Sequence, residues 1–303
     1  MTTHSHEAND AAGVERALVL GGGGPVGYAW TAGLLSGLVD AGRDLRRAER
    51  IVGTSAGAIA GAQFALGVDV AAGLSTELNR RSEPSPYESA ATGGIGDLLS
   101  IFAGAARAAD PDQARAAIGA TALAAKTMTE EEFLAGPGYA SLAGQVWPPA
   151  FRATAVSATT GRLVVWSADS GVDLAKAVAS SSSVPGFTPP VTMHGDRYMD
   201  GGARSSLNAD LVAGARSVIV VSCTALTPPE GLDPALAAPY EDQAAELDAI
   251  RAAGGSLAVI EPGPEFLALS GHGTRLMDMG LIPEAFQVGR EQGAKEAPRL
   301  DSW

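Results

Sequence analysis

Residues 50–59 read RIVGTSAGAI, and this stretch decides which fold the sequence predicts. The apolar run at its start is typical of a buried strand, and the small residues after it are typical of a closely packed helix. Between them stands Ser55, flanked by Gly53 and Gly57 in the pattern G-x-S-x-G. This is the spacing of a nucleophile elbow, a sharp strand-to-helix turn whose glycines permit unusual dihedral angles and whose serine hydroxyl projects outward. We therefore expect Ser55 to be a nucleophile beside the free N–H groups of the following helix.

A glycine-rich stretch precedes this motif. Residues 21–27 read GGGGPVG and contain G-x-G-x-x-G at Gly22, Gly24 and Gly27, between a predicted strand at 16–20 and a predicted helix at 26–42. A dinucleotide-binding loop of this type needs an acidic residue at the tip of the second strand, where this chain has Gly53-Thr54-Ser55. The other anion that such a loop can hold is the oxyanion of a tetrahedral intermediate. The loop and Ser55 would be neighbours, because parallel strands end at one edge of the sheet.

A third motif, Asp200-Gly-Gly202, follows residues 191–199, which are predicted to form a hairpin turning at Gly195-Asp196. A carboxylate at a strand end can approach another backbone closely when glycines follow it. Taken alone, an aspartate before glycines is also typical of an ordinary turn.

Together, and in this order, the three motifs resemble those of the patatin-like phospholipases, a family of plant patatins and bacterial lipid acyl hydrolases. The stretch SSSVPGFTPPV at residues 181–191 is also similar to that family, and the resemblance spans about residues 16–220. It implies a three-layer α/β/α fold with a mostly parallel central sheet. It also implies a serine that works with an aspartate and without a histidine, so that Ser55 is the nucleophile and Asp200 the base.

The resemblance further implies an oxyanion hole made by the backbone N–H groups around Gly22, Gly23 and Gly24. The other glycines of the three motifs are Gly27, Gly53, Gly57, Gly201 and Gly202. The implied substrate is a lipid or other acyl ester, reached by transient contact with a membrane or micelle surface, and no cofactor or metal is implied. The chain departs from the family at Val26, where relatives commonly carry Arg or Lys, and Pro25 has no N–H to donate.

Two other functions stay open from the sequence. The order Ser55, Asp200, His272 also fits a Ser–Asp–His esterase of the α/β-hydrolase type. A non-catalytic lipid- or nucleotide-binding module is the other alternative, and Val26 keeps its lipid-binding version open. A metal site at His194, Asp196 and Asp200 is disfavoured, because the predicted turn already explains an aspartate at 196.

Composition limits the remaining choices. The 303 residues are 46% hydrophobic and carry a net charge of −13, which suits one large domain and argues against nucleic acid as a partner. A single cysteine, Cys223, excludes a disulfide framework within the chain. The N-terminal residues do not resemble a signal peptide, and no apolar run is long enough for a transmembrane helix, so we expect a cytoplasmic protein.

The expected organisation is a disordered tail at 1–14 and one α/β domain at 15–303. Residues 69–147 lack strand patterns and are expected to form a helical insertion over the active edge of the sheet, with Leu98, Leu99, Ile101 and Phe102 as a candidate lipid-facing lid patch. Further elements are predicted as a hairpin at 151–167, helices at 173–186, 209–215, 240–254 and 282–297, and strands at 217–222 and 256–262.

Overall fold

The computed structural model describes residues 11–68, 102, 104–228, 230–234, 237–300 and 303. They contain one eight-stranded sheet with the order β5-β6-β3-β2-β1-β7-β8, in which β4 also pairs with β3. The strands are β1 Arg16–Leu20, β2 Arg50–Gly53, β3 Phe151–Ser157, β4 Leu163–Trp166, β5 Val191–Met193, β6 Asp196–Asp200, β7 Ser217–Val221 and β8 Ser256–Ile260. The five strands from β3 to β8 in this order are parallel, and β4, β5 and β6 are antiparallel to their neighbours.

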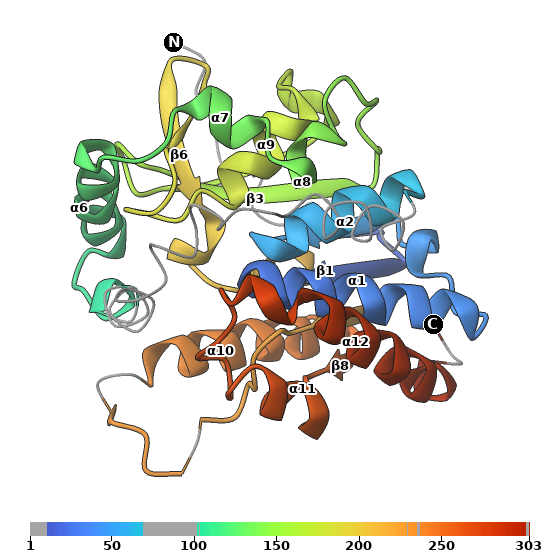
Figure 1. Cartoon of the computed structure of the whole chain (residues 1–303). Helices are drawn as coiled ribbons and strands as arrows, with labels where there is room; N and C mark the ends of the chain where they lie inside the picture. The colour runs from blue at the N-terminus through green and yellow to red at the C-terminus, as the bar shows by residue number, and fades with distance from the viewer. Residues whose placement is uncertain (1–10, 69–101, 103, 229, 235–236, 301–302) are drawn as a thin grey trace.

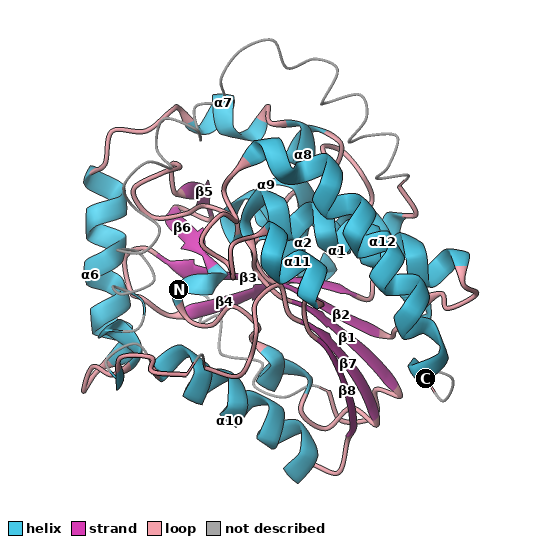
Figure 2. Ribbon diagram, turned by 60° about the horizontal axis from the view of Figure 1, so that its bottom comes forward, coloured by secondary structure: helices cyan, strands magenta, loops and turns pink. Residues whose placement is uncertain are grey.

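Helices cover both faces of the sheet and give the three layers that the sequence predicts (Figures 1 and 2). Alternate residues of β1 point to opposite faces. Leu18 and Leu20 pack in one cluster with helices of one face, whereas Ala17 and Val19 pack in another with a helix of the opposite face. The helices of the two faces are α1 Gly24–Asp40, α2 Ala56–Leu66, α9 Leu174–Ser181, α11 Pro264–Leu269 and α12 Ile282–Glu296 on the first, and α10 Ala238–Ala252 on the second.

The first and last long helices, α1 and α12, pack almost backbone to backbone (Figure 1). The reason is a pair of G-x-x-x-G patterns, one on each helix. A Cβ added to any of these glycines would overlap a backbone carbonyl of the opposite helix. The four glycines are Gly33 and Gly37 on α1, and Gly289 and Gly293 on α12.

β2 and β6 meet end to end along one edge of β3. Ala153 of β3 pairs with Gly53 at the end of β2, and Ala155 pairs with Asp200 at the end of β6. β4 occupies the other edge over the same residues of β3, so β2 and β6 must share the remaining edge. The two strands run toward each other, so their C-terminal ends face each other. One residue of β3 lies between the residue that pairs with Gly53 and the residue that pairs with Asp200. This register brings two segments together that lie 145 residues apart in the chain.

Most predicted elements are present, and some differ in their bounds. The β5–β6 hairpin turns at His194-Gly195 and not at Gly195-Asp196, because both residues have positive φ angles (51° and 80°) and Met193 pairs with Asp196. The helix expected at 209–215 is a short 3-10 turn, η4, at Ala209–Val212. Helix α11 was not predicted.

The expected tail does not extend to residue 14. Ala11 is fully buried, and the Val14 carbonyl accepts a hydrogen bond from the N–H of Arg216. In the expected insertion, the described residues include α6 Pro111–Ala124, α7 Glu130–Leu134 and α8 Pro137–Ala140.

The candidate lid patch lies mostly outside the described residues: only Phe102 is described. Its side chain is partly buried against a cluster that contains Val156 and Met199. In the described part of the chain, no helix has the length and apolar character needed to cross a membrane.

Candidate active site

The turn from β2 to α2 has the backbone conformation of a nucleophile elbow. Ser55 has φ 54° and ψ −120°, a combination that residues with side chains rarely adopt. The flanking glycines are required because the turn is tight: a Cβ on Gly57 would overlap the carbonyl of Leu20, and one on Gly53 would lie 2.6 Å from the Cα of Ala58. The sequence pattern therefore produces the predicted elbow for steric reasons.

The hydroxyl of Ser55 points to a carboxylate and does not cap its helix. A serine at the N-cap normally accepts a hydrogen bond from the first turn, but Ser55 makes no such bond. Its Oγ instead donates to Oδ2 of Asp200 at 2.7 Å. The arrangement leaves the hydroxyl beside an acceptor that can take its proton.

Asp200 ends β6 in a nearly closed environment, with 5% of its surface exposed. Burial raises the pKa of its carboxyl from 3.8 to about 6, against the opposing effect of hydrogen bonds from the Gly202 N–H and Ser55. The Gly202 N–H donates to Oδ1 at 2.7 Å, so both carboxylate oxygens have a donor. Gly201 must be a glycine because a Cβ there would overlap Thr154.

The glycine loop lies against Ser55. A Cβ on Gly22 would sit 3.3 Å from the Cβ of Ser55. The N–H of Gly22, expected among the oxyanion donors, instead donates to the carbonyl of Ser206 at 2.8 Å. Among the hydrogen bonds of the described residues, none uses the N–H of Gly23 or Gly24. These two groups stand at the N-terminus of α1, where a helix leaves its N–H groups unpaired.

Two residues that the sequence analysis did not connect to the site support these segments. Cys223 packs against the glycine loop, so closely that a Cβ added to Gly23 would lie 2.7 Å from the Sγ of Cys223. Asn208 is fully buried at φ 54°, and its Nδ2 donates to Oγ1 of Thr54, next to the nucleophile, at 3.1 Å. Neither residue belongs to a recognisable pattern, so no sequence signal could have found it.

Val26 is fully buried in the core, and its N–H donates to the carbonyl of Leu276. A long cationic side chain at this position would therefore have to enter the apolar cluster of α1 and α12. The buried environment accounts for a valine in this chain.

The histidines lie elsewhere. His272 is exposed in the loop after α11, and in the described part of the chain no hydrogen bond involves its imidazole. The Nε2 of His194 lies 3.0 Å from the carbonyl oxygen of Ser170, at the far end of the β5–β6 hairpin from Asp200. Among the described residues, no group of three or more His, Cys, Asp or Glu could hold a metal ion.

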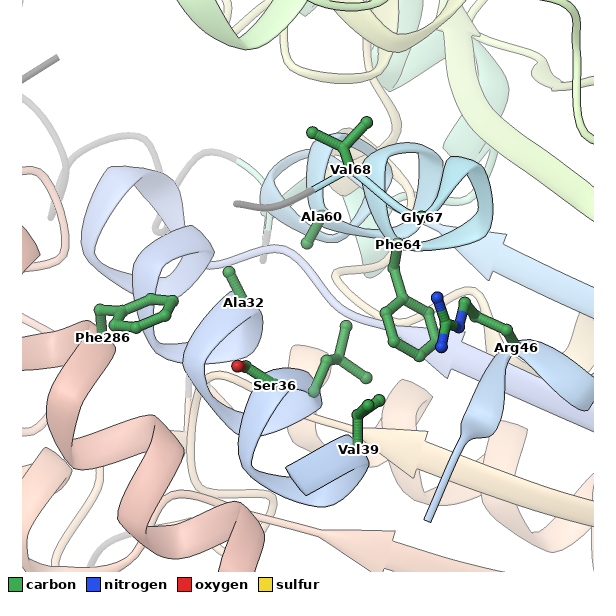
Figure 3. A pocket seen from close by; sticks show the side chains of 10 residues that line it. Ala32, Ser36, Val39, Arg46, Ala60, Phe64, Gly67, Val68 and Phe286 are labelled. Carbon is green, nitrogen blue, oxygen red and sulfur yellow. The ribbon is translucent and has the colours of Figure 1, made fainter. Parts of the chain in front are cut away.

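A cavity of about 140 Å³ lies beside the helices and away from Ser55 and Asp200 (Figure 3). Its apolar walls come from α1, α2 and α12, with Arg46 stacked on the ring of Phe64 at one side. Ser55 and Gly24 stand at the N-terminal ends of α2 and α1, whereas the cavity is lined from Ala32 and Ala60 onward to the C-terminal ends. The cavity is therefore separate from the elbow.

Comparison with family models places this sequence in a family. The family model described as "Patatin-like phospholipase" matches residues 18–213. The solved structure of VipD from Legionella pneumophila is 14% identical, with a TM-score of 0.38, covering 89% of this chain and 67% of VipD. The type III effector protein ExoU is 17% identical, with a TM-score of 0.35, covering 93% of this chain and 53% of ExoU. This chain thus spans about half the length of ExoU. No curated protein matches in sequence.

The family match covers more than half of the chain and contains the elbow, the glycine loop and Asp200. The chain therefore belongs to the patatin-like phospholipase family and is an ester-bond hydrolase.

Proposed function

We propose that the chain hydrolyses carboxylic ester bonds of lipids through a Ser55–Asp200 dyad and an acyl-enzyme intermediate. The observation that carries the proposal is the 2.7 Å hydrogen bond from Ser55 Oγ to Asp200 Oδ2. A carboxylate is an inefficient base when its pKa is far below the working pH. Burial raises the pKa of Asp200 to about 6, which improves the match.

In the first step, Asp200 Oδ2 takes the proton of Ser55 as Oγ attacks the ester carbonyl carbon. The carbonyl oxygen becomes an oxyanion. We assign its stabilisation to the N–H groups of Gly23 and Gly24, since that of Gly22 is engaged by Ser206. The intermediate then collapses, the C–O bond to the alcohol breaks, and the alcohol leaves with the proton from Asp200.

In the second step, water attacks the acyl-enzyme and gives a proton to Asp200. Collapse of the second intermediate breaks the bond to Ser55 Oγ, which takes that proton back and releases the carboxylic acid. A lipid substrate requires the elbow to meet a membrane or micelle surface transiently.

The test is labelling by a fluorophosphonate, followed by hydrolysis of p-nitrophenyl esters of increasing acyl length. Wild type should label once per chain, Ser55→Ala should not label, and Asp200→Asn should label and hydrolyse at least about 10³-fold more slowly. Asp196→Asn is the matched control, because Asp196 begins the same strand and bonds Ser157 and Thr159 instead of Ser55. Substantial hydrolysis by Asp200→Asn would contradict the dyad. Failure of the wild type to label would favour the non-catalytic binding module.

A further inference from the structure

Four consecutive serines, Ser180 to Ser183, lie at the C-terminal end of α9, which packs beside α2 and β6. The sequence predicts only a serine-rich turn here. In the structure, Ser180, Ser181 and Ser183 are fully buried, so each of their polar groups needs a partner within the protein.

Two of these serines lie against the backbone of Ser55, and Ser181 bonds it directly. The Oγ of Ser181 accepts a hydrogen bond from the N–H of Ser55 at 2.9 Å. The Oγ of Ser182 donates to the carbonyl of Val178 at 3.0 Å and lies 3.4 Å from the carbonyl oxygen of Ser55. Both backbone polar groups of the strained residue therefore face the same short segment.

The same segment also holds the base. The carbonyl of Ser183 accepts a hydrogen bond from the N–H of Asp200 at 2.8 Å. Only one residue separates the position that binds the nucleophile, 181, from the one that binds the base, 183. The end of α9 thus bonds the backbones of both reacting residues.

We propose that Ser181 is a positioning residue of the hydrolytic reaction: its hydroxyl holds the Ser55 backbone so that Oγ stays on Asp200. The N–H of Ser55 is occupied by this bond. Removing the hydroxyl would leave the part-buried N–H of Ser55 without this acceptor, at a residue whose φ is 54°. The backbone would then relax toward another partner and carry Oγ with it. The inference rests on the proposed dyad.

The experiment compares Ser181→Ala with Ser180→Ala. Both side chains are fully buried on the same helix. The Oγ of Ser180 accepts from Nε1 of Trp166 and donates to the carbonyl of Ala177, so its loss breaks two hydrogen bonds away from the dyad. Loss of the Ser181 hydroxyl breaks one, at Ser55. If Ser181 had only a structural role, Ser180→Ala should lower activity at least as much as Ser181→Ala.

The positioning role predicts the opposite for activity. Ser181→Ala should lower kcat and the rate of fluorophosphonate labelling by about 10- to 100-fold, with KM close to that of wild type because Ser181 touches no substrate. Ser180→Ala should keep most of both rates. Ser181→Thr, which retains a hydroxyl, should label faster than Ser181→Ala. The melting temperature of each variant reports whether it is folded.

The inference is wrong if Ser181→Ala labels as fast as Ser180→Ala, or if Ser181→Thr is no faster than Ser181→Ala. The proposed function can fail separately, since hydrolysis by the Ser55→Ala variant would refute the proposed dyad. If Ser55→Ala is inactive and Ser181→Ala is not impaired, only the positioning role is refuted.

Discussion

Replacing Asp200 by asparagine should abolish activity and make the protein more stable. The carboxyl group is buried, and burial raises its pKa from 3.8 to about 6, because removing a charge from water is unfavourable. Asparagine has the same shape and carries no charge. Its oxygen can still accept from the Gly202 N–H, and its NH₂ can donate to Ser55 Oγ.

The pKa of Asp200 determines the size of this stability difference and how it changes with pH. Below pH 3.8 the carboxyl is protonated in both the folded and the unfolded chain, so no charge is buried. Above pH 6 the charge is present in both states and opposes folding fully. A rise of about two units corresponds to about 3 kcal/mol, at 1.36 kcal/mol per unit. Asp200→Asn should therefore be more stable than wild type by about 3 kcal/mol at pH 8 and by roughly half as much at pH 5.

Urea denaturation of both proteins at pH 5 and pH 8 measures this difference. Asp196→Asn is a control for which the change in stability is expected to have the opposite sign. Burial raises the pKa of Asp196, but hydrogen bonds from Thr159, the Arg197 N–H and Ser157 outweigh it and hold the pKa below 3.8. Its ionised form therefore favours folding, and Asp196→Asn should be less stable than wild type at pH 8. An Asp200→Asn variant no more stable than wild type at pH 8, or a difference that does not change with pH, would refute the reasoning.

Three further results are expected. Because Asp200 acts as a base only when ionised, kcat/KM for a neutral ester should fall as the pH drops through about 6, and a pH–rate profile that stays flat down to pH 4 would contradict this assignment. His272→Ala should leave kcat within about threefold of wild type in ester assays, whereas a loss of about 10³-fold would support a Ser–Asp–His triad. Gly289→Ala places a Cβ against the carbonyl of Trp30 and should lower the free energy of unfolding by roughly 1–3 kcal/mol in urea, while Gly104→Ala, with no atom within 4 Å of its Cβ, should not.

The sequence predicts the strands and the elbow well because local physics determines them. The apolar runs at β1, β2 and β7 have no alternative to burial, and the elbow requires glycines on both sides of Ser55. The pairing of Ser55 with Asp200 is different. No local pattern joins residues 145 apart, and only the order of motifs suggested it. The register of β2 and β6 along β3 is the physical cause, and strand register across such distances cannot be read from the chain.

The differences between the predicted and observed elements come from single residues whose backbone angles or hydrogen-bond partners no sequence pattern shows. His194 takes a positive φ, which is uncommon for residues other than glycine, so the turn was predicted one residue too late. At η4, the preceding Asn208 is committed to hydrogen bonds with Thr54 and the carbonyl of Ser205, and only a short 3-10 turn follows. The N–H of Gly22, which was expected in the oxyanion hole, donates to the carbonyl of Ser206, a residue far away in the sequence.

The close packing of α1 and α12 has a consequence for the order of folding. Their contacts join segments about 250 residues apart, as in the ion pair between Asp40 and Arg290. Contacts between such distant segments form late, because a long loop must close before they contribute. On the ribosome, α1 emerges early and must wait for α12 before its glycines are covered. The loop at the head of α1 depends on equally distant partners, because the N–H of Gly22 bonds the carbonyl of Ser206 and that of Val26 bonds the carbonyl of Leu276, so it reaches its final position only after those residues have been translated.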